Sequence, residues 1–584
     1  MKRTLKIFLT MSLSLGVLIL ACKRDFLERA PLGSLDQGNL ANSAGVSKLL
    51  IGAYSLLNGT GGAGSGFGTG PANWVFGGVA SDDAYKGSDP GDQADIVSIE
   101  TYTANASNPY FDSKWRVLYD AVQRSNEVIR VVALAKDMTD AEKKTTLGEA
   151  RFLRAFYHFE LKRIFNNIPY VDETISYANN NLLVPNDKDV WPMIEADMKF
   201  AADNLPATQP AIGRANSWAA KAFLGKIYLY ERKFSAAKPL FDEVIANGVT
   251  AGGKKYDLVP FQNNFNAETK NSAEAIFSAQ YSVNDNSGGN RGSYSEVLNY
   301  PYNGGPGGCC GFYQPSQSLV NSYQVDANGL PLLDTWNDTN LKSDQGLKSE
   351  DPYSPDVTTP VDPRLDETVG RRGIPYLDWG LHPGNNWIRD QNNGGPYAPI
   401  KNVYFKKQEA SLTDKSFWSS GVNANNYTIM RFADVLLMSA EVEADAGNLA
   451  GAMALVNRVR QRSADPKGWV KTYKDNAAPE KGYTTTNAAN YQIGLYTVFP
   501  SKDYAVKAVR FERKLELAME GQRFFDLVRY GIAAEVLNAY IAKEKNDRVF
   551  LKNASFTKGK SEYYPIPRNQ IDLSKGTLKQ NQGY

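Results

Sequence analysis

Side chains that commonly act in catalysis are scarce in this sequence. Its 584 residues include only two histidines, His158 and His382. No His-Glu-x-x-His, Cys-x-x-Cys or Gly-x-Ser-x-Gly pattern occurs, so the usual motifs of a metalloprotease, a paired-cysteine site and a serine hydrolase are missing. Both histidines are therefore predicted to have structural or surface roles. We predict no catalytic residue and no cofactor.

Acidic residues are so numerous in this chain that finding two of them side by side says little about function. The chain has 63 of them, and Asp82 beside Asp83 is one such pair. A glycosidase needs two carboxyl groups that converge on one sugar bond, and adjacency in the sequence does not predict convergence. The aspartates at positions 82, 83, 89, 92 and 95 do not follow the spacing of an EF-hand loop, so no metal site is predicted.

Aromatic residues are better suited to recognising a ligand. The 32 tyrosines and 9 tryptophans exceed the needs of a core, and a flat ring can pack against the C–H face of a sugar. Neighbouring amide, carboxylate and guanidinium groups would then bond the sugar hydroxyls. Two loops combine these residue types, one around residues 81–93 and one around the Gly-Gly-Cys-Cys-Gly turn at 307–311. The predicted ligand-binding residues are Trp74, Tyr85, Asp92, Arg291, Tyr294, Tyr300, Tyr302, Tyr313 and Trp336.

The alternative for each of these rings is that it packs beneath its own loop. For any single aromatic residue, packing is the commoner outcome. For the loop cluster as a whole, the mixture of rings with Asn, Asp and Arg favours recognition, and it suits a long neutral glycan.

The chain has three cysteines, of which Cys309 and Cys310 are adjacent. If Cys22 carries a lipid, the adjacent pair can bond only to each other or to another molecule. A disulfide between neighbours is a tight ring, because their Cα atoms are closer than an unstrained disulfide prefers. Free thiols and a vicinal disulfide both remain open.

The first 22 residues have the pattern of an export signal. Basic residues precede an apolar run that ends at Ala21 and is too short to cross a bilayer comfortably. The run resembles a bacterial lipobox, so residues 1–21 are predicted to be a lipoprotein signal peptide, Cys22 to be lipidated and residues 22–40 to be a tether. Loss of residues 1–21 leaves 62 basic against 63 acidic residues, which gives no basic excess for nucleic acid.

Helix signals dominate residues 41–265. Asn108 and Pro109 supply a cap and a first-turn proline, and Thr139 with Glu142 forms a capping-box pattern. These patterns predict two long amphipathic helices, one after each signal.

Two helix pairs have the spacing of a tetratricopeptide repeat. Gly225 and Ala237 are twelve residues apart, and Ala440 and Ala452 repeat that interval. In such repeats, small residues let two antiparallel helices approach closely. A stack of these pairs buries a continuous core and forms a scaffold.

The composition changes at residues 266–425, where Gly, Asn, Pro and Asp dominate and helical periodicity is absent. We expect a loop-rich, partly stranded insertion, and long irregular segments in compact proteins usually carry function. Residues 426–584 return to helical patterns and close the same fold. The predicted fold class is mainly α, a tetratricopeptide-like scaffold with a large loop-rich insertion.

The segment from Arg510 to Gly531 is predicted to be one helix with a buried face. Its apolar residues recur at helical spacing. Charged residues spaced three or four apart, such as Glu516 with Glu520 and Arg523 with Asp526, are typical of a solvated ladder.

The sequences of five segments resemble motifs of the SusD/RagB family of outer-membrane nutrient-binding lipoproteins. The most specific segment is 512–531, Glu-Arg-Lys-Leu-Glu-Leu-Ala-Met-Glu-Gly-Gln-Arg-Phe-Phe-Asp-Leu-Val-Arg-Tyr-Gly. The others are 149–161, 431–437, 563–568 and 580–584, so the resemblance extends to the last residue.

This resemblance implies a lipid-anchored protein on the outer face of the outer membrane of a Bacteroidetes-type bacterium. Members of the family cover a SusC-like TonB-dependent transporter barrel and deliver an oligosaccharide or polysaccharide to it without catalysis. Some relatives bind oligopeptides, which is the alternative ligand. Tyr85 and Lys86 stand where the starch-binding member of the family has a tryptophan-rich loop, so the resemblance does not predict starch itself.

Overall fold

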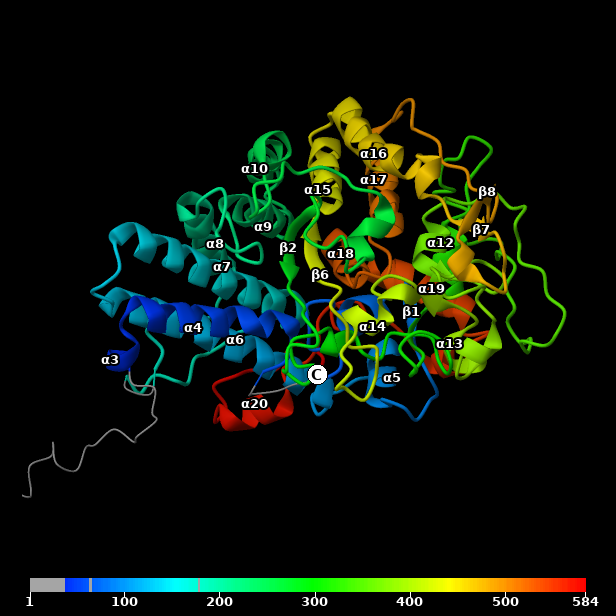
Figure 1. The fold of residues 1–584 in the computed structure, drawn as a ribbon. Helices are drawn as coiled ribbons and strands as arrows, with labels where there is room; N and C mark the ends of the chain where they lie inside the picture. Colours follow the sequence, from blue (N-terminus) through cyan, green and yellow to red (C-terminus); the bar gives the residue numbers. More distant parts are fainter. Residues whose placement is uncertain (1–36, 62–65, 177–178) are drawn as a thin grey trace, which may run out of the picture.

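The computed structural model describes residues 37–61, 66–176 and 179–584, and these residues form a mainly helical fold with small two-stranded sheets (Figure 1). The predicted fold class is confirmed. Within these ranges, no helix combines the length and the apolar composition needed to cross a membrane. The predicted signal peptide, Cys22 and most of the predicted tether lie outside the described residues.

Helices of the first half pack in chain order, with α6 (Pro109–Leu134) against α7 (Asp140–Phe165), α7 against α8 (Trp191–Asn204), and α8 against α9 (Ser217–Tyr230). Both predicted helix starts are confirmed, because the Asn108 side chain accepts a hydrogen bond from the Tyr110 N–H and Thr139 forms a capping box with Glu142. The helices are α3 (Gln37–Leu40), α4 (Ser43–Ser55), α5 (Asp95–Glu100), α6 (Pro109–Leu134), α7 (Asp140–Phe165) and α8 (Trp191–Asn204).

Both predicted repeat-like pairs are pairs of packed helices. The first is α9 (Ser217–Tyr230) with α10 (Phe234–Asn247), and the second is α15 (Phe432–Asp445) with α16 (Leu449–Ser463). Gly225 permits the close approach in the first pair, because a Cβ atom there would lie 2.5 Å from the Phe241 ring. Since α10 also packs against α15, the two pairs are stacked on each other.

Four antiparallel strand pairs occur in the described part of the chain, and two of them tie the loop-rich region to the helical scaffold. The pairs are β1 (Ala84–Gly87) with β3 (Phe312–Pro315), β2 (Ala275–Ala279) with β6 (Tyr427–Arg431), β4 (Val369–Gly370) with β5 (Ala398–Pro399), and β7 (Lys471–Tyr473) with β8 (Tyr483–Asn487). The loop-rich region also contains four short helices, α11 (Gln317–Ser322), α12 (Leu365–Thr368), α13 (Gln391–Gly394) and α14 (Glu409–Leu412), and most of its remaining residues are turns or irregular chain.

The prediction of one helix from Arg510 to Gly531 is wrong. The chain forms α17 (Lys502–Glu516), a turn, and then α18 (Arg523–Tyr530), followed by α19 (Ala533–Glu544) and α20 (Arg568–Leu573). Within the turn, Gly521 has φ +63°, and a Cβ atom there would lie 1.8 Å from the Ala72 carbonyl oxygen. A glycine is needed because the backbone of a distant segment presses against it.

The interpretation of this segment's charges as a solvated ladder is also wrong. Glu512 and Glu516 are fully buried, and Glu516 accepts hydrogen bonds from Arg364, Arg431 and Arg462. Burial alone would raise the pKa of Glu516, but the three guanidinium groups hold that pKa well below its usual range. The charged residues in the last turns of α17 face the interior because partners from other segments meet them there.

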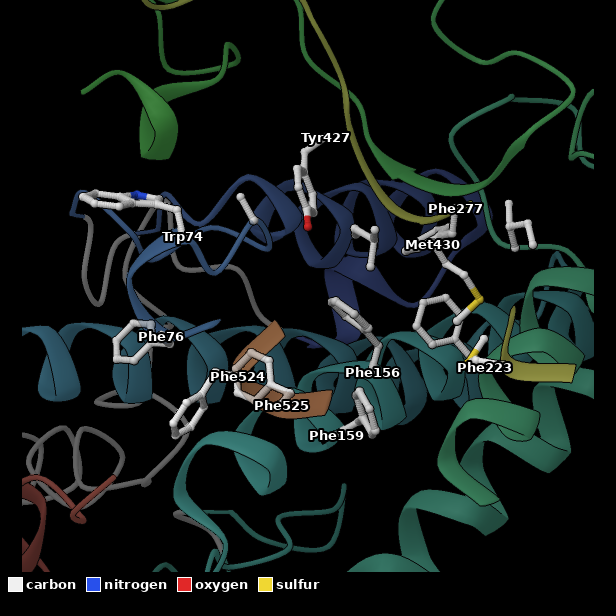
Figure 2. Close-up of a cluster of buried hydrophobic side chains, with 14 of the residues drawn as sticks. Trp74, Phe76, Phe156, Phe159, Phe223, Phe277, Tyr427, Met430, Phe524 and Phe525 are labelled. Atoms are coloured by element: carbon white, nitrogen blue, oxygen red, sulfur yellow. The ribbon is translucent and has the colours of Figure 1, made fainter. Parts of the chain in front are cut away.

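One large hydrophobic core runs from α4 to the C-terminal residues. Figure 2 shows part of it, where Phe524 and Phe525 of α18 lie among Phe76 and the α7 residues Phe156 and Phe159. Helix α4 and the C-terminal residues therefore share one closely packed core, and the loops are attached to this helical body.

Candidate functional site

A polar and aromatic patch lies beside the β1–β3 ladder. Lys86, at the end of β1, donates from Nζ to the carbonyl oxygens of Asp89 (2.6 Å) and Asp92 (2.7 Å), which holds the following turn in place. Arg389 reaches this turn from the loop before α13 and forms ion pairs with Asp89 (2.5 Å) and Asp92 (2.6 Å). Its guanidinium also lies 5.5 Å from the centre of the Tyr302 ring. We call Tyr302, Arg389, Asp89 and Asp92 the Tyr302 patch.

The side chains of the Tyr302 patch are partly open to solvent, at about a third for Arg389 and both carboxylates. Burial would raise the pKa of Asp89, but the N–H groups of Asp92 and Gly91 together with Arg389 lower it. The Tyr302 N–H donates to the Trp387 carbonyl oxygen at 2.7 Å, which fixes the ring's backbone. The patch therefore offers a ring, a fixed guanidinium and charged acceptors to a ligand.

A second group of rings surrounds Tyr294. Its ring stacks on Phe67 with 5.8 Å between centres and meets Phe417 edge-on at 5.6 Å. Phe417 in turn lies 5.5 Å from Trp418, which is 59% exposed. We call Phe67, Tyr294, Phe417 and Trp418 the Trp418 cluster. Its inner rings support an indole that is open to solvent.

The glycine loop, residues 303–311, connects the two groups. It begins directly after Tyr302, and its Gly307 carbonyl oxygen accepts a hydrogen bond from Ser419, the neighbour of Trp418, at 2.9 Å. The Gly307 N–H donates to the Tyr404 hydroxyl, which itself donates to Ser420. The Tyr302 patch and the Trp418 cluster therefore flank one loop.

Cys309 and Cys310 lie near the end of the glycine loop, and their sulfur atoms are bonded as a vicinal disulfide. Cys310 is buried and Cys309 is half-buried against the main core. Of the two states open from the sequence, the structure has the disulfide.

Four of the nine predicted ligand-binding residues lie in the core. Trp74 donates from Nε1 to the Ser295 carbonyl oxygen and packs against Tyr313, which is also buried. The Tyr85 hydroxyl donates to Glu544 at 2.5 Å, and the Tyr300 hydroxyl bonds to residues of the 402–423 segment. Burial raises the pKa of these three phenols well above the usual value. None of the four offers a ring face to solvent.

The remaining predicted residues are spread over the surface. Asp92 and Tyr302 belong to the Tyr302 patch, and Tyr294 belongs to the Trp418 cluster. Arg291 is exposed, forms a loose ion pair with Asp285 (3.6 Å), and lines a separate cavity of about 310 Å³. Trp336 is half-buried between Phe511 and Lys514 and joins neither group.

Sequence reasoning missed Arg389, Phe67, Phe417 and Trp418. The adjacent rings Phe417 and Trp418 stand in a stretch of serine, glycine and asparagine, Ser-Phe-Trp-Ser-Ser-Gly, which is a usable signal for an exposed aromatic loop. Arg389 carried no local signal, since its partners lie about 300 positions away in the chain.

Other reactive side chains have structural surroundings. His158 and His382 are buried, and burial lowers the pKa of each to about 3. His158 Nε2 accepts from the Val171 N–H, and His382 Nδ1 accepts from the Gly384 N–H. Among residues 37–61, 66–176 and 179–584, no group of three or more His, Cys, Asp or Glu side chains is arranged to hold a metal ion.

Comparison with known proteins identifies the class of protein. A family model described as the SusD family matches residues 273–584, which is more than half of the chain, and the model "Starch-binding associating with outer membrane" matches residues 81–229. The chain belongs to the SusD family. It is thus a SusD-like, non-catalytic binding protein of an outer-membrane-associated type, as expected from the resemblance.

Relatives are similar over most of their length. SusD-like protein P2 of Formosa agariphila is 24% identical over 511 residues, which cover 85% of this chain and 86% of that protein. Among solved structures, a SusD superfamily protein from Bacteroides vulgatus is 21% identical with a TM-score of 0.66, covering 94% of this chain and 99% of the other.

The names of two further solved structures mention a ligand. A laminarin-binding SusD-like protein is 23% identical with a TM-score of 0.64 and covers 93% of this chain and 100% of its own. Surface glycan-binding protein A from Bacteroides thetaiotaomicron, in complex with laminarihexaose, is 20% identical with a TM-score of 0.64, and the match covers 92% of this chain and 99% of the other. At this identity, the likeness establishes the fold.

Proposed function

We propose that the chain captures a neutral oligosaccharide on the face that runs from the Tyr302 patch, along the glycine loop, to the Trp418 cluster. The observation that carries this proposal is that Tyr302 and the exposed Trp418 flank one loop, with Arg389 and two carboxylates beside the Tyr302 ring. Ring faces pack against sugar C–H groups while the charged groups bond the hydroxyls.

Binding of this kind suits a protein that passes its ligand onward. A face with one exposed ring and one partly open ring orders few groups and buries modest area, so its affinity is moderate and its ligand leaves readily. In our proposal the ligand moves to a SusC-like TonB-dependent barrel, which the chain covers from the cell exterior. The chain would be held at the outer membrane by the lipid on Cys22. Family membership supports this part of the proposal.

Isothermal calorimetry of the mature chain with laminarihexaose, other neutral oligosaccharides and a mixed peptide digest tests the proposal. Trp418→Ala and Tyr302→Ala should each weaken glycan binding at this face at least tenfold, because each removes one ring face. Chromatography of the recovered sugar should show unchanged chain length, as expected of a binder without catalysis.

The matched control is Trp218→Ala, which removes a half-buried tryptophan on α9 and should leave the affinity unchanged. The proposal is wrong if both loop variants bind the glycan as the unaltered chain does. Binding of the peptide digest alone would identify an oligopeptide carrier instead.

A further inference from the structure

A groove separate from the glycine loop lies at the C-terminal end of α16. A cavity of about 790 Å³ is bounded by the segment 257–261, the last turn of α16 and Trp469. A second cavity of about 350 Å³ opens toward β7 and β8. The two share Glu367, Lys467, Gly468 and Trp469, so they form one continuous depression, which we call the Trp469 groove. Figure 1 shows α12, which carries Glu367, on the side of the molecule that carries β7 and β8.

Glu367 is the unusual residue of the Trp469 groove. It is only 4% exposed, and its Oε2 atom has no hydrogen-bond partner among the residues that the structure describes. Burial raises the pKa of Glu367 to about 8; the nearby Arg462 opposes this, while Asp362 and Glu516 add to it. A buried polar group without a partner costs free energy, so its position on the wall of a cavity points to a ligand that supplies the missing bond.

Several other charged side chains of the groove already have partners. Arg458 pairs with Asp257 at 3.0 Å, and Arg462 pairs with Glu274 and Glu516 in the interior. The Asp465 carboxylate accepts the Lys467 N–H at 3.1 Å. The linings of the two cavities together contain four basic and four acidic side chains, so the groove has no large excess of one sign with which to attract an ion.

Trp469 supplies a fixed ring to the lining that it shares with Glu367. Its Nε1 donates to the Ser463 carbonyl oxygen at 2.8 Å, and Tyr491 meets the ring edge-on at 6.0 Å between centres. The indole is half-buried, its Nε1–H is hydrogen-bonded, and the Lys471 ammonium lies 5.6 Å from the ring centre, so a ligand would meet the partly open ring beside this cation. A held ring beside a carboxyl group that lacks a partner combines the two contacts that a sugar makes with a protein.

We propose that the Trp469 groove is a second binding site for a neutral oligosaccharide, distinct from the face around the glycine loop. One sugar packs on Trp469 while its hydroxyls bond the Glu367 carboxyl group. The ligand class rests on the proposed function, but the site, its residues and a second bound ligand go beyond it. Two sites on one chain would bind two short glycans independently, whereas one glycan long enough to reach both sites would be held with higher avidity than either site alone gives.

Stoichiometry tests this proposal on the mature full-length chain. Calorimetry with laminarihexaose and a panel of neutral hexasaccharides should give two ligands per chain for the unaltered protein. Trp469→Ala should remove one of them, and Trp418→Ala should remove or weaken the other. Glu367→Gln, which keeps the shape of the side chain, should weaken the groove site about tenfold or less and leave the loop site unchanged.

The outcomes separate this proposal from the proposed function. One ligand per chain that survives Trp469→Ala but is lost in Trp418→Ala overturns the second site and leaves the proposed function intact. No glycan bound by the unaltered chain overturns both. A groove that takes only the peptide digest, with loss in Trp469→Ala, overturns the sugar assignment. If Trp469→Ala does not fold, Trp469→Phe and Glu367→Leu decide between these outcomes.

Discussion

Arg431 and Glu516 form an ion pair with 2.5 Å between Nη1 and Oε1, although both side chains are sealed from solvent. Glu516 also pairs with Arg364 and Arg462, and Arg431 also pairs with Glu274. These contacts join α17 to the end of β6, the start of β2, α16 and the segment before α12. The most family-specific segment of the sequence is therefore a buried electrostatic junction between elements that are far apart in the chain.

Removing one charged group from this junction should destabilise the fold strongly. Glu516→Gln leaves three buried guanidinium groups without their shared carboxylate, so we expect the free energy of unfolding to fall by about 3–5 kcal/mol. Urea unfolding at pH 7 measures this. The control is Asp572→Asn, which breaks an exposed pair with Arg568 and should cost less than about 1 kcal/mol. If the free energy of unfolding of Glu516→Gln also falls by less than about 1 kcal/mol, the buried ion pairs do not have the structural role proposed for them.

Glu100 should make the stability depend on pH in the opposite direction from an ordinary paired carboxylate. Burial raises its pKa to about 8, with the Lys86 N–H and charge opposing the shift. Between the unfolded value near 4.5 and about 8, the folded chain holds a proton that the unfolded chain releases, so this contribution to stability falls as pH rises. The free energy of unfolding of Glu100→Gln should therefore rise relative to that of the unaltered chain by on the order of 4 kcal/mol between pH 5 and pH 9.

Urea unfolding of both chains at several pH values measures that difference. Glu350→Gln, at an exposed position, is the control and should differ from the unaltered chain by the same amount at every pH. If the unfolding free energies of Glu100→Gln and the unaltered chain also differ by the same amount at every pH, the Glu100 carboxyl group is already ionised at pH 5 in the folded chain.

Replacing two helical glycines by alanine should change stability in opposite directions. In Gly225→Ala, the new methyl group meets the buried Phe241 ring, and this overpacking should cost about 1–3 kcal/mol beyond any helix-propensity gain. In Gly52→Ala, on α4, the methyl group has no described atom within 4 Å, so helix propensity should stabilise the chain by about 0.5–1 kcal/mol. Thermal unfolding compares them, and a stabilising Gly225→Ala would disprove the close helix approach.

Arg389 should affect binding more than stability. Arg389→Ala removes the cation beside the Tyr302 ring and leaves Asp89 and Asp92 without a counter-charge, so glycan affinity at the glycine-loop face should fall about tenfold. Because the pairs are partly exposed, the unfolding free energy should change by less than about 1 kcal/mol. Arg568→Ala is the control. Equal affinities of the two variants would exclude Arg389 from the site.

Local structure was predictable because its causes are local. The cap at Asn108 and the capping box at Thr139 are hydrogen bonds between residues two or three positions apart, so they could be read from adjacent residue types. The paired helices around Gly225 and Ala440 could be read as well, because the groove between two neighbouring helices demands small residues at fixed spacing.

The break between α17 and α18 was not predictable in this way. The segment keeps helical periodicity through residues 517–522, but the Ala72 backbone presses on Gly521 and the Asp83 side chain accepts the Met519 N–H. These partners come from more than 400 positions earlier, and no window of the local sequence contains them. Tertiary contacts outweighed the intrinsic preference for helix.

The sequence by itself determined the helical scaffold, the family and the two loop regions rich in rings and polar groups. Only the tertiary structure decided which rings face outward. Tyr85 and Tyr302 both belong to segments predicted to be ring-bearing loops. Tyr85 lies on β1 and is buried, with its hydroxyl donating a hydrogen bond to Glu544 of α19, while Tyr302 stays partly open beside Arg389. Burial of a side chain is set by partners that folding brings from distant segments, and residue type and spacing do not encode those partners locally.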